Sequence, residues 1–352
     1  MSEHVRTALA TIVEGGTLDL DTARLAMGEV MDGEATAAQL AALLMGLRMR
    51  GETVDELAGF ATAMRERVVR VEAPEGTVDV VGTGGDGSGT FNISTAAALV
   101  LAAAGIPVAK HGNRAITSKS GSADVLHALG VRIDHDADSA GLALRDHGFA
   151  FLFAPNFHPA MRHANPTRKE LGVRTAFNLL GPLTNPAGTS RQLLGVGDPR
   201  AAGRFAEVVH RLGTERTLVV HGAGVDELPL DGTGILYEVT PDGVEQRVVD
   251  AVALGLRATA TSKLAGADPA TNARYLEAIL RGEPSARRDV VVLNAGAAFL
   301  ASGTVESIED GIDRAALTID AGLTAELLER LRAERRTAES DAAQTPPIGT
   351  PA

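Results

Sequence analysis

The sequence contains no cysteine and no tryptophan, and only 3% of its residues are aromatic. Without cysteine the chain can form neither a disulfide nor a thiolate metal site, so any metal ligand must be an oxygen or a histidine nitrogen. No apolar run approaches the roughly 20 residues that a membrane-spanning helix needs. The formal net charge of −12 disfavours general nucleic-acid binding, because an acidic surface repels a polyanion. We therefore expect neither a membrane nor nucleic acid as a partner.

The 352 residues suffice for two domains. The first stretch, MSEHVRTALATIVEGG, resembles neither a signal peptide nor a transit peptide, so a cytoplasmic protein is expected. Apolar residues at helical spacing, interrupted by glycines, predict a small helical domain over residues 1–72, with Asp19 or Asp21 capping its second helix. A helical return to this domain is expected near 165–185. The predicted helices are 5–13, 18–31, 37–49 and 54–68.

From Val78 onward, short apolar runs alternate with helical segments. This βαβ order predicts a larger α/β domain over 73–336 with a mainly parallel sheet. Asp242-Gly243 between two strand-like runs predicts a hairpin turn, and the Ala-, Pro- and polar-rich stretch 337–352 is expected to be a disordered tail. The predicted strands of the alternating region are 78–81, 106–109, 131–133, 149–154, 193–197 and 217–222, and its helices are 96–104, 122–129, 139–147 and 201–212.

The segment GTGGDGSGTFNIST, residues 82–95, follows the first predicted strand. Glycine permits positive φ and lets a ligand approach the backbone, and the free N–H groups of a following helix attract anions. A literal match to the dinucleotide fingerprint is weak, because the helix begins only near Asn92 and Lys110 stands where an acid is required. The Walker pattern is absent, and a purely structural glycine turn is the alternative. The segment favours a phosphate or pyrophosphate site.

Two further loops also follow predicted strands. Residues 110–122 (KHGNRAITSKSGS) combine cations, an amide and hydroxyls, which suit a multiply charged phosphate. Asp226 and Glu227 follow the strand at 217–222, and adjacent carboxylates suit Mg²⁺. Taken alone, either segment could be an ordinary solvated surface. Because ligands of parallel sheets bind beyond the carboxyl ends of the strands, we expect these loops to converge with the glycine segment.

A fourth motif, FAPNFHPAMRH, is followed by a helical segment that begins near Arg168. Pro155 and Pro159 stiffen the loop that bears His158. An arginine beside such an apolar, proline-shaped pocket is a candidate for binding a carboxylate. The alternative is an arginine on a solvated helix face.

These motifs together resemble one family. GTGGDGxxTFNIST, KHGNRxxTSKSGSAD, FAPNFHPAMRH, TRKELGVRTAFNLLGPLTNP and HGAGVDEL occur over roughly residues 5–335 in the order found in anthranilate phosphoribosyltransferases. The resemblance implies a helical domain and an α/β domain of the nucleoside phosphorylase/phosphoribosyltransferase-like fold, usually in a homodimer paired through the helical domain. It implies that phosphoribosyl pyrophosphate (PRPP) and anthranilate give phosphoribosyl anthranilate and pyrophosphate, with Mg²⁺, in tryptophan biosynthesis.

The resemblance also implies roles for individual residues. Thr117 replaces a more usual serine, and Thr167 stands where relatives are often apolar; neither change removes a functional group. The implied catalytic residues are Lys110, Asn113 and Arg168, and the implied Mg²⁺ ligands are Ser94, Asp226 and Glu227. The implied anthranilate contacts are Gly82, Asn113, His158 and Arg168. The implied PRPP contacts are Gly82, Gly85, Asp86, Thr90, Asn92, Ile93, Ser94, Thr95, Lys110, His111, Gly112, Asn113, Arg114, Ala115, Ile116, Thr117, Ser118 and Ser122.

Two other readings are open. Pyrimidine nucleoside phosphorylases share this architecture, but the KHGN sequence and the Asp226-Glu227 pair favour a diphosphorylated sugar. A non-catalytic nucleic-acid-binding relative should have a basic surface and a degraded metal site, which the charge of −12 and the intact motifs disfavour.

Overall fold

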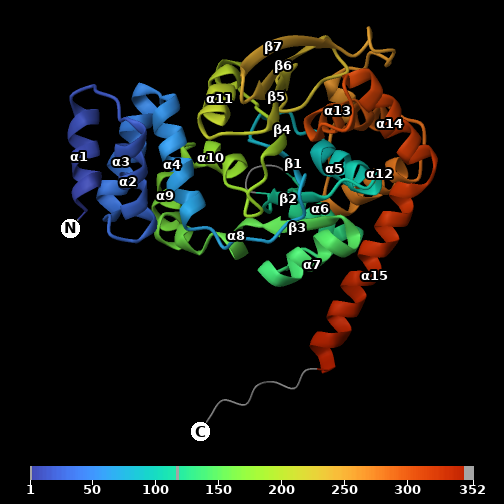
Figure 1. Ribbon diagram of the computed structural model, residues 1–352, viewed down its shortest axis with the longest axis horizontal. Helices are drawn as coiled ribbons and strands as arrows, with labels where there is room; N and C mark the ends of the chain where they lie inside the picture. Colours follow the sequence, from blue (N-terminus) through green and yellow to red (C-terminus); the bar gives the residue numbers. More distant parts are fainter. Residues whose placement is uncertain (1, 116–118, 345–352) are drawn as a thin grey trace.

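Helices α1 to α4 form a bundle at the N-terminal end of the chain, beside a larger α/β domain (Figure 1). The computed structural model describes residues 2–115 and 119–344. Thr36 and Thr53 begin α3 and α4 with capping boxes, and Asp19 caps α2 by accepting a hydrogen bond from Thr22 N. The bundle consists of α1 (Glu3–Val13), α2 (Leu20–Met31), α3 (Ala37–Arg50) and α4 (Val54–Glu66).

The buried carboxylate of Glu56 links the parts of this bundle. It accepts hydrogen bonds from the backbone N–H groups of Leu18, at 2.9 Å, and Thr53, at 2.8 Å, and forms an ion pair with Arg50. A buried charge requires such partners because its desolvation is costly. The carboxylate therefore connects α4 to the end of α3 and to the chain that enters α2.

The described residues of the α/β domain form a seven-stranded sheet in the order β3-β2-β1-β4-β5-β6-β7. The first five strands are parallel, and β6 and β7 form the antiparallel hairpin that Asp242-Gly243 predicts. The fold class inferred from the sequence is confirmed. The strands are β1 (Val78–Gly82), β2 (Val108–Gly112), β3 (Phe149–Phe153), β4 (Arg191–Gly195), β5 (Arg216–Gly222), β6 (Thr233–Thr240) and β7 (Gly243–Asp250).

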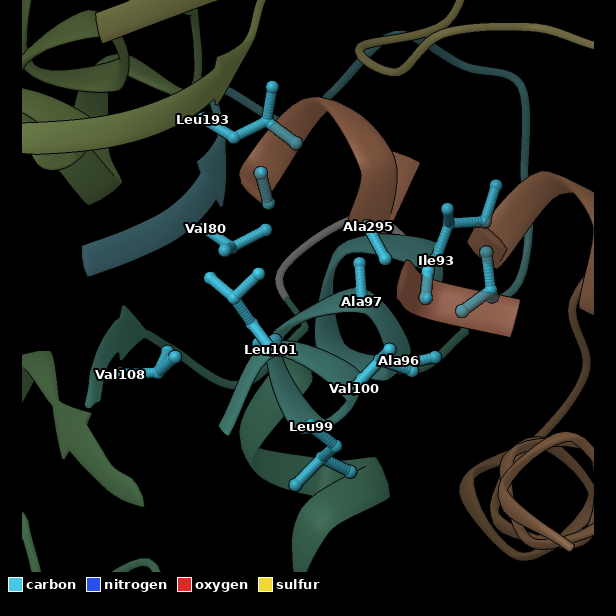
Figure 2. Packing of buried hydrophobic residues seen from close by; sticks show 14 of the residues in the cluster. Val80, Ile93, Ala96, Ala97, Leu99, Val100, Leu101, Val108, Leu193 and Ala295 are labelled. Atoms are coloured by element: carbon cyan, nitrogen blue, oxygen red, sulfur yellow. The ribbon is translucent and has the colours of Figure 1, made fainter. Parts of the chain in front are cut away.

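Helix α5 (Ile93–Ala103) begins within the last residues of the glycine segment and is buried almost all round. Figure 2 shows its side chains packed among Val80, Val108 and Leu193 of the sheet and Ala295 of α13 (Ala286–Ser302). A helix that is apolar on every face is stable only when it is enclosed in this way. The core thus fixes the direction in which the N-terminus of α5 points.

The remaining helices cover the sheet and return to the bundle. Phe177 and Phe205 belong to the same apolar cluster as Leu44 and Phe60 of the bundle, so the two domains share a continuous core. Near residues 165–185 the chain packs α9 against α3 and α10 against α4. The helices are α6 (Ser122–Leu129), α7 (Ala137–His147), α8 (Ala154–Phe157), η1 (Pro159–His163), α9 (Asn165–Leu171), α10 (Phe177–Leu180), η2 (Gly181–Leu183), α11 (Pro199–Arg211), η3 (Thr261–Leu264), α12 (Pro269–Leu280), α13 (Ala286–Ser302), α14 (Ile308–Asp320) and α15 (Leu323–Gln344).

The strand predicted at 131–133 is wrong. Gly130 ends α6 in the left-handed conformation with φ 84°, and the N–H of Val131 donates to Leu126 O at 2.9 Å, as in a helix cap. That donor is therefore unavailable to a strand ladder. Val131 and Ile133 are buried in the core instead, which is why the run is apolar.

The disordered tail is predicted to begin at residue 337, which is too early, because residues 337–344 continue α15. This helix projects from the domain in Figure 1. This stretch contains no glycine or proline and is rich in good helix formers. Residues 345–352 lie outside the described part of the chain. Within that part, no helix, including the 22-residue α15, is apolar enough over sufficient length to cross a membrane.

Candidate active site

The loops that follow β1, β2 and β5 meet at one edge of the sheet. The carboxylate Oδ2 of Asp226 accepts a hydrogen bond from Gly84 N at 2.8 Å, and Asp226 N donates to Asp86 Oδ2 at 3.3 Å. Lys110, in the middle of β2, places its Nζ 2.6 Å from Val80 O and 3.4 Å from Ser94 Oγ. The convergence expected from the βαβ order is therefore present.

Asp86, Asp226 and Glu227 form an acidic cluster whose carboxylate oxygens lie within 4.8 Å of one another. Burial, reinforced by the negative charge of Asp86, raises the pKa of Asp226 to about 6. Burial also raises the pKa of Glu227 well above its ordinary value, and the charges of its two neighbours raise it further. Glu227 Oε2 is buried and has no hydrogen-bond partner among the described residues. A hard divalent cation fits this donor set, since it would satisfy the orphan oxygen and relieve the repulsion.

Ser94 and Lys110 adjoin the acidic cluster. Ser94 lies in the first turn of α5, and its backbone opposes only in part the rise that burial causes in the pKa of Glu227. Lys110 is only 2% exposed, and burial lowers its pKa to about 8 against the opposing charges of Asp79, Glu227 and Asp226. The lysine therefore lies within the protein beneath the loops and compensates their negative charge. Asp86, expected only as a PRPP contact, belongs with the candidate metal ligands.

Glycines permit this convergence by leaving out side chains. A Cβ on Gly82 would lie 2.2 Å from Asp226 Oδ2, and one on Gly195 would lie 1.6 Å from Asp226 O. At Gly85, where φ is +66°, a Cβ would lie 1.4 Å from a guanidinium nitrogen of Arg174. These glycines make room for other parts of the protein as well as for a ligand.

Sequence reasoning overlooked Arg174 and Asp79. Arg174 donates to Gly84 O at 3.1 Å, so the segment after α9 touches the glycine loop. Asp79 is fully buried in β1, where burial raises its pKa to about 6; it accepts a hydrogen bond from His111 N at 3.3 Å. An acid inside an apolar strand run was the available signal for Asp79. Arg174 had no local signal, because its contact is 90 residues away in sequence.

A cavity of about 560 Å³ opens beside the glycine loop, and all four residues expected to contact anthranilate line it. Arg168 is half-buried there, with its guanidinium 4.9 Å from the ring centre of Phe177. Its Nη1 donates to Asn165 Oδ1 at 3.3 Å, and it has no carboxylate partner in the described part of the chain. Burial lowers the pKa of this guanidinium, so a bound carboxylate would be stabilising. The residues in question are Gly82, Asn113, His158 and Arg168.

Two buried histidines form part of the cavity wall. Their Nε2 atoms lie 3.2 Å apart, and His111 Nδ1 lies 3.2 Å from Gly181 O. The carbonyl can only accept, so His111 is protonated at Nδ1 and His158 donates through Nε2. Burial lowers the pKa of His111 to about 3 and that of His158 to about 4. This wall is therefore polar but uncharged at neutral pH.

Some of the other residues expected to contact PRPP connect the glycine loop and the loop after β2 to the rest of the protein. Asn92 Nδ2 donates to Ser120 O at 3.1 Å, and Asn92 Oδ1 accepts from Asn272 Nδ2 at 3.1 Å. Arg114 pairs with Asp124 at 3.0 Å. Ile93 is buried in the core, and Thr90 forms a β-bridge with Ala265. Thr95 Oγ1 is buried without a partner among the described residues. Ala115 N donates to Asp124, and Gly112 faces Ser122, whereas Ile116, Thr117 and Ser118 lie outside the described residues.

The fold and the site together define the class of protein. A family model described as glycosyl transferase family, helical bundle domain, matches residues 6–68, and one described as glycosyl transferase family, a/b domain, matches residues 74–325. The chain is 49% identical over 330 residues to the anthranilate phosphoribosyltransferase of Azorhizobium caulinodans, which covers 94% of this chain and 96% of that relative. The chain belongs to the family of anthranilate phosphoribosyltransferases.

Solved structures agree with this assignment. The crystal structure of anthranilate phosphoribosyltransferase from Thermus thermophilus matches with a TM-score of 0.88 and 44% identity, over 94% of this chain and 99% of that one. The Saccharomyces cerevisiae enzyme in complex with PRPP and Mg matches with a TM-score of 0.85 and 26% identity, over 95% of this chain and 98% of that one.

The buried His158 should make stability depend on pH. Its pKa is about 4 in the folded protein and 6.5 ordinarily, so the unfolded chain binds the proton more tightly. The stability that depends on neutral His158 is therefore fully present above pH 6.5. As the pH falls toward 4, the free energy of unfolding should decrease by up to about 3 kcal/mol. Replacing it in His158→Gln should flatten this fall, as measured by urea unfolding across pH 4–8. An unchanged slope, relative to a matched His4→Gln control, would contradict the analysis.

Proposed function

We propose that this chain is a cytoplasmic anthranilate phosphoribosyltransferase, which transfers the phosphoribosyl group of PRPP to the amine of anthranilate. The observation that carries this proposal is the meeting of two unlike sites at Gly82. On one side the glycine loop and the acidic cluster suit a metal-bound diphosphate. On the other side lies a cavity that suits an aromatic carboxylate, because its Arg168 has no carboxylate partner among the described residues.

The proposed reaction is a substitution at the ribose C1 carbon. The bond from C1 to the anthranilate nitrogen forms, the C1–oxygen bond to pyrophosphate breaks, and the nitrogen gives up a proton. An aromatic amine is already neutral at pH 7, so positioning and charge stabilisation account for the catalysis. Arg168 holds the anthranilate carboxylate, and Asn113 orients the ring and amine. Lys110 supplies positive charge beneath the loops.

Ser94, Asp226, Glu227 and Asp86 are the residues proposed to hold Mg²⁺. When bound, this ion would offset negative charge on the departing pyrophosphate. The yeast relative in complex with PRPP and Mg supports this part of the proposal.

A fluorescence assay tests the function directly. Anthranilate fluorescence should disappear only when PRPP and Mg²⁺ are both present, and an equal amount of pyrophosphate should form. Phosphorolysis of thymidine or uridine should be absent. If anthranilate is not consumed and either nucleoside is cleaved, the protein is a nucleoside phosphorylase and the proposal is wrong.

Arg168→Ala should raise the KM for anthranilate by about 30- to 150-fold, because a charge-assisted hydrogen bond worth about 2–3 kcal/mol is lost. The KM for PRPP should change little. Lys169→Ala is the matched control, since Lys169 is an exposed cation on the same helix. Steady-state kinetics with each substrate varied in turn decides the matter; an unchanged anthranilate KM would exclude Arg168 from the substrate cavity.

Glu227→Gln should raise the Mg²⁺ concentration needed for half-maximal activity by about tenfold or more, because a charged ligand becomes a neutral one. Asp226→Asn should act in the same direction, while its remaining carbonyl can still accept from Gly84. Asp231→Asn, at an exposed position nearby in sequence, is the control. Identical Mg²⁺ titrations for all of these variants would show that the pair does not bind the ion.

We also infer a homodimer paired through the helical bundle. Val13 at the end of α1 and Met49 near the end of α3 are each 84% exposed, and these two helices are in contact. Large apolar side chains exposed on neighbouring helices are candidates for an interface. Light scattering should report twice the mass of one chain for the wild type and a single-chain mass for a Val13→Glu, Met49→Glu double variant. A single-chain mass for the wild type would overturn the inference.

A further inference from the structure

A second cavity, of about 220 Å³, lies at the junction of the two domains. Here the connection from α4 to β1 passes the segment that leads into β4, and Val71 N donates to Pro186 O at 3.1 Å. Pro182 lines both this cavity and the proposed substrate cavity. We call it the hinge cavity; the lining residues that matter here are Arg65, Arg70, Pro182, Asn185, Thr189 and Gln192.

Two arginines of the hinge cavity have no carboxylate partner among residues 2–115 and 119–344. Arg65 donates through Nε to Leu183 O at 2.6 Å, which leaves its two terminal nitrogens without a partner there, and burial lowers its pKa. The side chain of Arg70 forms no hydrogen bond or ion pair with the described residues. Arg67, between them in sequence, pairs with Asp32 at 2.7 Å. The hinge cavity is therefore lined by two cations, the largely buried Arg65 and the exposed Arg70, whose charge no described carboxylate compensates.

A third donor lies in the same lining. Thr189 Oγ1 is buried and has no hydrogen-bond partner in the described part of the chain. Leaving such a group unsatisfied costs about 1–3 kcal/mol, so a ligand that accepts its hydrogen bond would be favoured.

The other polar groups of the lining are already engaged. Gln192 Nε2 donates to Pro182 O at 2.7 Å, and Asn185 Nδ2 donates to Ala109 O at 2.8 Å. No aspartate or glutamate is among the described lining residues. Asp79 contacts Gln192 at 3.4 Å from the buried side and is not part of the lining. The hinge cavity therefore offers donors and positive charge.

We propose that the hinge cavity binds a small oxyanion, a molecule that bears a phosphate or a carboxylate, at Arg65, Arg70 and Thr189. Guanidinium groups match the geometry of both oxyanions and bind them through paired hydrogen bonds. The volume accommodates one such group with a few waters. Arg65 belongs to the helical bundle and Thr189 to the segment before β4, so the anion bridges the two domains.

Thermal unfolding of the full chain tests this site, with inorganic phosphate or acetate titrated at constant ionic strength and chloride as the reference. A ligand that binds only the folded state raises the melting temperature as its concentration exceeds its dissociation constant. Arg70→Gln and Thr189→Val should each weaken the apparent affinity by about tenfold. Neither side chain bonds to another described residue, so both variants should fold. The anion that binds with the higher apparent affinity identifies the chemical class of the ligand.

Arg6→Gln is the matched control, because it removes a charge that is also exposed but lies on α1, outside the lining of the hinge cavity. Phosphate bound at the glycine loop contributes equally to all of these proteins, so their differences report the hinge cavity alone. The measurement needs no turnover and is independent of the proposed activity. The proposal would be overturned if the anion raised the melting temperature of wild type, Arg70→Gln and Thr189→Val equally. It would also be overturned if Arg6→Gln lost as much affinity for the anion as those two variants.

Discussion

The position of Asp226 is the constraint on which the site depends. Its carboxylate bonds to Gly84, its amide bonds to Asp86, and its carbonyl occupies the space that a side chain at Gly195 would need. Gly82 and Gly195 are paired in the register of β1 and β4. Two adjacent strands must therefore end in residues without side chains so that the loop after β5 can cross them. The fold assembles the acidic cluster in this way without help from a ligand.

The same packing determines the electrostatics. Lys110 lies beneath the loops, where burial and the surrounding carboxylates oppose one another in setting its pKa. Charges in such a low-dielectric environment interact more strongly than they would in water. The acids of the cluster outnumber this lysine, and the excess negative charge is what a divalent cation would neutralise. The substrate cavity differs in character, because its histidine pair is neutral and Arg168 carries the charge beside Phe177.

The sequence predicts the parts of this protein whose signals are local. Strand-end loops with glycines, hydroxyls and paired acids are recognisable from spacing and residue type, and the parallel order then requires them to share one edge. Val131 shows the limit of that reasoning, because an apolar run reports burial and says nothing about where its N–H groups bond. Arg174, Asp79 and the His111–His158 contact depend on residues far apart in sequence, so spacing contains no information about them. Such contacts follow from tertiary packing alone.

The single residue Pro182 forms part of the wall of both cavities. Its carbonyl is also held by Gln192, which touches Asp79. Any substitution of Pro182 that enlarged the proposed substrate cavity would therefore also change the wall of the hinge cavity. Met64 and Met161 line the proposed substrate cavity but not the hinge cavity, so enlarging the first cavity from their side leaves the second unchanged.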